Sequence, residues 1–419
     1  MYGFRRRSMR NIYKHFAIMM TILICVSLVS ATMASGYDNT TNGEADIKST
    51  IESYFDLQYE ILSKLDIEEL STQVANNDGM FVSDSYADKF RTVMQMAVAH
   101  KSAQIVDLTY DRYNISIEYR EIYISGNQAL VKAFLIEQIY FNADSSIMSE
   151  AGTMHNISLQ KNGDGWYITN DEFSLDGYGE TYELYKQRYA QRLSCDMSLN
   201  EYILSAYSQE IAADIERREQ IYNLDENARN IQDNEGVYAT LTAHTYDPDD
   251  PVDYAHTYCR TSNPSPWSTL DLDCTNFISI ALHQDIPMDT SGNKWYWNTR
   301  SDRSASWASA EYFRRYIYNN NSSTSSNSGI YGKHDTYANC GLGDIIQYAS
   351  DTENVWSTDN RPVSTHSSIV TKVSTSGGRK LYVSMHSYGT EQSDYRYDYL
   401  VDNMPYSYKH YLNIVRYYS

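Results

Sequence analysis

A single cysteine of this chain stands where its thiol could become a nucleophile. Cys274 follows Asp273 and opens the stretch 274–282, whose apolar residues recur at helical spacing. This spacing predicts a helix that begins at Cys274 and is buried on the cysteine's side, with Asp273 capping it by accepting backbone N–H hydrogen bonds. Because a helix N-terminus favours the thiolate, the pattern indicates covalent catalysis by Cys274. The alternative is a small core residue.

Two histidines bound a predicted β-hairpin further along the chain. His366 begins the first strand, His386 ends the second, and the Ser/Thr/Gly-rich turn 374–378 lies between them. A hairpin centred on Ser376 would place the two imidazoles opposite each other, so that one serves as base to Cys274 and the other orients the first. A slip of one residue would put the rings on opposite faces of the sheet. The alternative is that both histidines only fill strand positions.

Few other residues are candidates for catalysis, metal binding or disulfide formation. The remaining histidines show no metal-ligand spacing with the cysteines, so we expect no metal ion and no cofactor. If Cys274 is free, then Cys195, Cys259 and Cys340 can form at most one disulfide, for which Cys259–Cys340 is our choice. Trp295 is a candidate substrate contact, with a core position as the alternative.

The N-terminus and the charge indicate where the protein works. Basic residues between Arg5 and Lys14 precede the apolar run 16–29 and the small residues Ala31 and Ala34, which predicts a secretory signal over residues 1–34. An uncleaved anchor is the alternative. Without the five basic residues of the signal, 34 − 5 = 29 basic residues face 54 acidic ones, a net charge of −25. We therefore expect a secreted or extracellular protein, either free or associated with the cell wall, with no nucleic-acid partner and no stable membrane association after cleavage.

The elements that must position the chemistry form a predicted α+β chain. Helical patterns near 47–62 and 85–101 precede four strand-like runs, at about 104–112, 114–124, 128–141 and 149–173. Residues 35–178 therefore resemble the cystatin-like/NTF2-like group of folds. The charged segment 179–236 predicts a helical connector or, equally, a helical hairpin packed on the last domain, which we place at 237–419.

The last domain resembles a known family on specific motifs. These are Asp273-Cys274-Thr275-Asn276-Phe277, Gly343-Asp344-Ile345 and His366-Ser367, with Tyr246-Asp247, Asn263-Pro264, Trp295-Tyr296 and Ser306-Trp307. They are similar to the putative amidase domain of secreted bacterial proteins, itself similar to the NlpC/P60 group of papain-like cysteine hydrolases. The resemblance implies a helix-borne cysteine packed on an antiparallel sheet.

The resemblance also implies a reaction. Cys274 would be the nucleophile, His366 the base and His386 the third polar residue of a triad that hydrolyses amide bonds through an acyl-thioester. The implied partners are cell-wall peptides or another amide substrate. The alternative is a non-catalytic wall-binding or adhesion protein that retains the fold, which the 40 tyrosines of the chain would also suit.

Overall fold

The computed structural model describes residues 40–76, 84–172, 178–192, 196–228, 243–270, 272–289, 294–320, 329–349, 355–356, 361–387, 394–406 and 408–418. The predicted secretory signal and Cys195 lie outside these ranges. Residues 40–49 form the first turns of helix α2, and the chain from Thr50 on forms one compact unit. None of the helices in the described ranges has the length and the apolar character that a membrane span requires.

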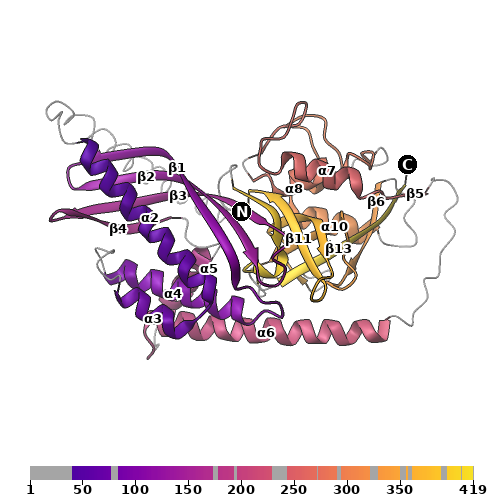
Figure 1. Cartoon of the computed structure of the whole chain (residues 1–419). Coiled ribbons are helices and arrows are strands. Elements are labelled where there is room, and N and C mark those ends of the chain that lie inside the picture. The colour runs from indigo at the N-terminus through magenta and orange to yellow at the C-terminus, as the bar shows by residue number, and fades with distance from the viewer. Residues whose placement is uncertain are drawn as a thin grey trace, which may run out of the picture. The chain divides into compact units, whose positions relative to one another are not determined.

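The first part of the chain combines helices with an antiparallel meander (Figure 1). The helices are α2 (Thr40–Lys64), α3 (Ile67–Asn76) and α4 (Asp84–Ser102), and the strands are β1 (Tyr110–Ser125), β2 (Gln128–Phe141), β3 (Ser149–Asn162) and β4 (Gly165–Asp171). A turn at Asn162–Gly165 divides the run predicted at 149–173 into β3 and β4, and Gly163 adopts a φ of 59° there. The strand expected at 114–124 is confirmed as β1, whereas the run expected at 104–112 contributes only its last residues, because residues 104–109 are not in a strand and a register shift, not a turn, follows Tyr110.

Two helices occupy most of the segment that was predicted to be helical. They are α5 (Tyr178–Ala190) and α6 (Leu199–Ala228). The glutamate Glu201 in the first turn of α6 accepts hydrogen bonds from the backbone N–H and the hydroxyl of Ser198, which is the reciprocal arrangement of a capping box. This local pairing explains why the helix begins at Leu199.

The C-terminal part alternates helices and strands. Its helices are α7 (Asp249–Tyr258), α8 (Cys274–Leu282), α9 (Ala305–Ala308), α10 (Ala310–Asn320) and the short 3-10 helix η2 (Val401–Asn403). Its strands are β5 (Ala243–Thr245), β6 (Gly329–Asp335), β7 (Ile345–Ala349), β8 (Val355–Trp356), β9 (Arg361–Pro362), β10 (His366–Ser374), β11 (Lys380–His386), β12 (Tyr395–Leu400) and β13 (Tyr408–Tyr418). The predicted hairpin from His366 to His386 is therefore confirmed as β10–β11.

One antiparallel sheet joins the two parts. Its strand order is β1-β2-β3-β12-β11-β10-β7-β13-β5, with β4 paired to β3 and β6 to β13. Strand β12 pairs with β3, with Arg396 opposite Ala151 and Tyr395 opposite Gly152. A Cβ at Gly152 would lie 2.6 Å from the Phe134 and Tyr395 rings, so only glycine fits this approach. The fold is thus mixed α+β with a large antiparallel sheet that runs through both parts.

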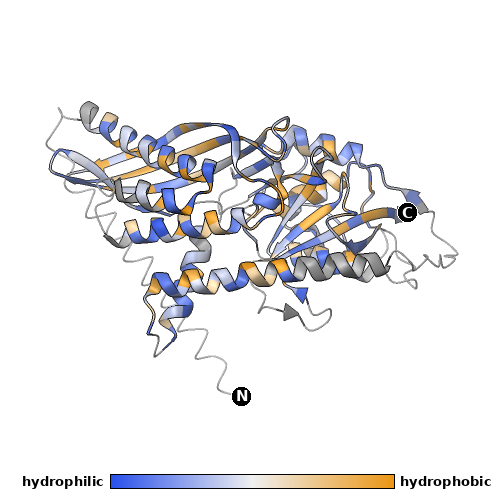
Figure 2. Ribbon diagram, turned by 60° about the horizontal axis from the view of Figure 1, so that its bottom comes forward, coloured by the Kyte–Doolittle hydropathy of each residue, from blue (hydrophilic) through white to orange (hydrophobic). Residues whose placement is uncertain are grey.

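The sheet carries a hydrophobic cluster on each face of its C-terminal half. Helix α8 packs on the first face, where Phe277 and Ile278 meet Ile345 and Ile369. The second face gathers Tyr348, Val370, Val383 and Met385. Figure 2 shows hydrophobic residues in the strands of the sheet, and hydrophobic and hydrophilic residues alternating along the helices. Each residue of β10 must therefore be assigned to one face or the other before its chemistry is discussed.

Candidate active site

Helix α8 begins at Cys274, as the sequence predicts. All nine residues of the helix are buried, and Phe277, Ile278 and Leu282 belong to the first hydrophobic cluster. The helix is therefore held by the core along its whole length, and the cysteine at its first position has a fixed place relative to the sheet. The thiol itself is nearly inaccessible, since Cys274 is 7% exposed.

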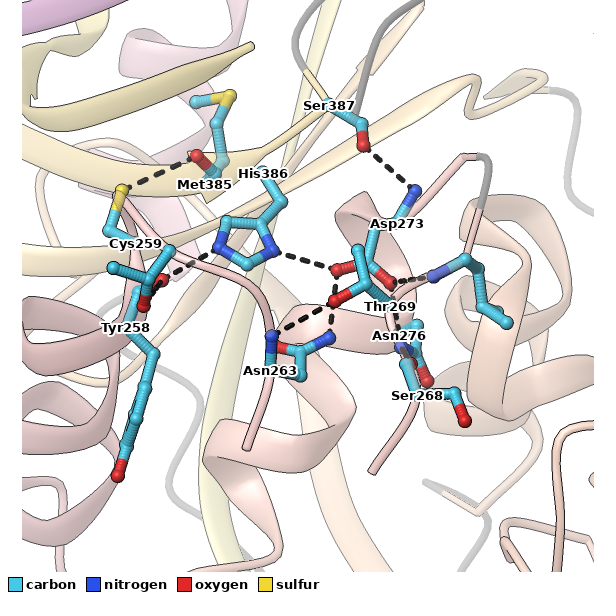
Figure 3. Close-up of polar contacts among 12 residues, drawn as sticks. Tyr258, Cys259, Asn263, Ser268, Thr269, Asp273, Asn276, Met385, His386 and Ser387 are labelled. Atoms are coloured by element: carbon cyan, nitrogen blue, oxygen red, sulfur yellow. Dashed lines mark hydrogen bonds and ion pairs between the residues drawn. The ribbon is translucent and has the colours of Figure 1, made fainter. Parts of the chain in front are cut away.

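Asp273 occupies the N-cap position, but its carboxylate does not cap the helix. Its oxygens instead accept hydrogen bonds from the Leu270 N–H at 2.7 Å and from the side-chain amides of Asn276 and Asn263 at 2.7 and 2.9 Å. The fourth partner is the His386 imidazole at 2.7 Å. The predicted cap is wrong because the carboxylate turns toward the preceding loop and the sheet, as Figure 3 shows.

His386 is held on both sides of its ring. Its Nδ1 lies 2.7 Å from Asp273 Oδ2, and its Nε2 lies 2.8 Å from the backbone carbonyl oxygen of Tyr258 on α7 (Figure 3). The ring stacks on Phe277 with centroids 4.0 Å apart. His386 thus ties strand β11 to α7 and to the start of α8, and both ring nitrogens are already engaged.

The polar contacts of the Cys274 thiol lie on the same side of the sheet as helix α8 and the His386 ring. Its Sγ lies 3.7 Å from Thr275 Oγ1 and makes a backbone hydrogen bond with Ser367. Thr275 Oγ1 lies 3.0 Å from Ser367 Oγ, which also accepts a hydrogen bond from Gln347 Nε2 at 3.0 Å. Burial raises the pKa of the Cys274 thiol, and the hydrogen bonds from Thr275 and Ser367 offset part of this rise. The thiol is accordingly protonated at neutral pH in this arrangement.

The register of the hairpin does not bring the two histidines together. Ile369 lies opposite Ser384, which puts His366 opposite Ser387 and Ser367 opposite His386. The predicted pairing of His366 with His386 is wrong by one residue, because a register shift between Val370 and Lys372 moves the strands past each other. The imidazoles consequently lie on opposite faces of the sheet.

His366 lies on the face away from helix α8. It pairs with Tyr348 across the sheet, its ring stacks on Tyr406, and its Nε2 lies 2.9 Å from Met385 Sδ. Burial, aided by the positive charge of Arg396, lowers the pKa of His366 to about 3. Among the described residues, the hydrogen bonds of the Cys274 thiol are with Thr275 and Ser367, and neither histidine is a partner.

Two other sequence-based predictions concern Trp295 and the cysteines. Trp295 is 0% exposed, its ring is tilted against Trp307 and its indole N–H donates to Ser279 Oγ, so it lies in the core and its role as a substrate contact stays a prediction. Cys259 and Cys340 are both free, which overturns the predicted disulfide. Cys259 lies against backbone oxygens of β11 and β12, and burial raises its pKa to about 12.

Several residues that build the site have no distinctive signal of their own in the sequence. Asn263, Thr275, Ser367 and Gln347 are ordinary polar residues by sequence, yet all four are buried around Cys274 and Asp273. Asn263, Thr275 and Ser367 did lie inside the quoted motifs, which was the available signal. Where the chain is described, no cluster of three or more His, Cys, Asp or Glu side chains could hold a metal ion.

The site and the sheet together define a mixed α+β domain with a buried cysteine at the start of a helix. Residues 245–413 match the model of the family described as "Putative amidase domain". The C-terminal part of the chain therefore contains a domain of this family, whose description indicates amide hydrolysis. No curated protein and no solved structure gave a significant match to the chain.

Proposed function

We propose that the chain is a secreted cysteine amidase that hydrolyses amide bonds in cell-wall peptides, with Cys274 as the nucleophile of a papain-like domain related to the NlpC/P60 group. The observation that carries this proposal is the position of Cys274, the first residue of α8 within the matched segment. The predicted signal at residues 1–34 supports a site of action outside the cell.

In the proposed reaction, the imidazole of His366 takes the thiol proton as Cys274 Sγ attacks the substrate carbonyl carbon. The tetrahedral oxyanion is held by the backbone N–H of Cys274. The leaving amine takes the proton back from His366, and water then hydrolyses the acyl-thioester, which returns the thiol. Metal ions and cofactors have no part in this scheme.

This scheme requires His366 to move. The thiol contacts the backbone of Ser367, so His366 is only one residue away along β10. Its ring must leave Met385 and Tyr406 before it can reach the sulfur, because the ring is packed on the opposite face. Thr365, which precedes His366, is hydrogen-bonded to the Tyr348 carbonyl oxygen on β7, so the movement concerns the His366 side chain and not the start of β10.

The proposal is tested by amine release from purified cell-wall peptides, followed by mass spectrometry. We expect the wild-type protein to release amines and Cys274→Ala to release none. Cys259→Ala is the matched control, since Cys259 is also buried and free but lies against backbone oxygens, so it should keep the activity. Equal release by wild type and Cys274→Ala would reject the proposal.

A second candidate is a non-catalytic cell-wall-binding protein that retains the fold. The low exposure of Cys274 and the raised pKa of its thiol favour it. Under this alternative, Cys274 alkylates at pH 7 no faster than an ordinary free cysteine, and the protein binds wall fragments without releasing amines.

A further inference from the structure

His386 and Asp273 form a buried pair directly beside the proposed nucleophile. Both side chains are almost fully inaccessible, and their atoms lie 2.7 Å apart. We propose that His386 carries two ring protons and acts as a positioning residue, which through Asp273 holds the N-terminus of α8 and with it Cys274. The catalytic consequence rests on the function proposed above, but the protonation state does not.

The hydrogen-bond partners of the His386 ring indicate that both of its nitrogens carry protons. Nδ1 faces a carboxylate oxygen and Nε2 faces the carbonyl oxygen of Tyr258, and a carbonyl oxygen can only accept. A neutral imidazole has one N–H and one bare nitrogen, so it would leave one lone pair directed at an oxygen. Two ring protons satisfy both contacts.

The hydrogen bonds of Asp273 indicate that its carboxyl group is ionised. A proton on this carboxyl group would provide the missing donor and leave His386 neutral. Yet the two oxygens of Asp273 already accept three N–H bonds, from Leu270, Asn276 and Asn263. Hydrogen bonds of this kind stabilise the ionised carboxylate. The pair is therefore an imidazolium facing a carboxylate.

The surroundings of His386 are compatible with its charge. The Phe277 ring from α8 stacks on the imidazole, with an angle of 25° between the planes, which allows a cation–π contact. Tyr395 lies opposite on β12, and the Tyr254 hydroxyl on α7 and the thiol of Cys259, which follows α7, have raised pKa values. Burial sets both shifts, so neither group is charged at neutral pH and Asp273 is the anion that pairs with the ring.

The pair matters for Cys274 because Asp273 is its neighbour. The charge of Asp273 contributes to raising the pKa of the thiol. A positively charged His386 compensates the negative charge of Asp273. Removal of the His386 imidazole alone therefore leaves an unbalanced carboxylate next to the sulfur. Both ring nitrogens are also occupied, which leaves His386 unable to accept the thiol proton in this arrangement.

Nitrogen-15 NMR of the histidine side chains in the wild-type protein tests the protonation state. The His386 signal is identified by its contact with the Phe277 ring. We expect both ring nitrogens to carry protons at pH 7. A bare nitrogen on His386 at that pH would overturn the proposal, whether or not the protein proves to be an amidase.

The rate of alkylation of Cys274, measured by mass spectrometry on the peptide that contains it, tests the positioning role of His386. We expect His386→Gln to slow alkylation at pH 8 about tenfold, as one unit of thiol pKa implies. The double variant D273N/H386Q removes both charges and should return to within about threefold of wild type. His256→Gln, which breaks a second histidine–aspartate pair at Asp398, is the matched control and should alkylate at the wild-type rate. A wild-type rate in His386→Gln would contradict the role.

Discussion

The thiol of Cys274 and the imidazole of His366 lie on opposite faces of the sheet at strand β10, to which His366 belongs. The thiol of Cys274 makes a backbone hydrogen bond with Ser367, whereas the imidazole of His366 stacks on Tyr406 on the far side. The sulfur thus contacts the residue that follows the proposed base, but the sheet separates it from the imidazole. Burial on the two faces keeps the thiol protonated and the imidazole neutral.

Replacement of His366 by phenylalanine should remove activity without unfolding the protein. A phenyl ring fits the apolar site beside Tyr348 and Tyr406, but it cannot accept a proton. We expect kcat for amide hydrolysis to fall by about 10²–10⁴-fold, the usual contribution of a general base, with little change in KM. Steady-state kinetics with urea denaturation measures both properties. Unchanged kcat would place the base elsewhere.

Loss of the Asp273 carboxylate should destabilise the fold strongly. Asp273→Ala leaves three buried N–H donors and the His386 ring without their acceptor, so we expect the free energy of unfolding to fall by about 3–5 kcal/mol. Urea denaturation monitored by fluorescence is the measurement. Asp302→Ala, at an exposed turn, is the control and should cost less than about 1 kcal/mol. Equal losses for the two variants would show that the buried network contributes little.

The fold was predictable to the extent that local patterns determine it. The apolar spacing after Cys274 located helix α8, and the turn 374–378 located the β10–β11 hairpin. The register was not predictable, because the shift between Val370 and Lys372 leaves no mark in a strand of small and branched residues. The contact of Asp273 with His386 joins residues 113 positions apart, and no local spacing encodes such a distance.

Asp344 should make stability depend on pH. Burial raises its pKa to about 6, above the ordinary value of 3.8, so the folded state binds its proton more tightly than the unfolded state does. The stabilisation is complete below about pH 4 and is lost as the pH rises to about 6. Over this window, the free energy of unfolding should fall by up to about 3 kcal/mol through this group.

The contribution of Asp344 is isolated by comparing slopes. Asp344→Asn has no proton to lose, so its free energy of unfolding should depend less on pH between 4 and 6 than that of wild type. Asp302→Asn should keep the wild-type slope, because that side chain is exposed. Urea denaturation at pH 4, 5, 6 and 7 provides the data. Identical slopes for wild type and Asp344→Asn would contradict the role of this carboxyl group.

Gly152→Ala should weaken the sheet where β3 pairs with β12. The new methyl group would overlap the Phe134 and Tyr395 rings, so we expect a loss of about 1–3 kcal/mol. Because the sheet is continuous, the loss should appear as one shifted transition and not as the early melting of one part. Gly43→Ala is the control, since a Cβ there meets nothing within 4 Å. Two separate melting steps in Gly152→Ala would contradict a shared sheet.

The role of Cys274 is tested most directly by trapping the acyl-enzyme. The wild-type protein is mixed with purified cell-wall peptides, quenched in acid within seconds and digested, and the peptide containing Cys274 is examined by mass spectrometry. We predict an added acyl mass on Cys274 that disappears on treatment with hydroxylamine and is absent from Cys274→Ser. Released amine without any acyl mass on Cys274, at an equal rate in Cys274→Ser, would contradict a cysteine-dependent amidase.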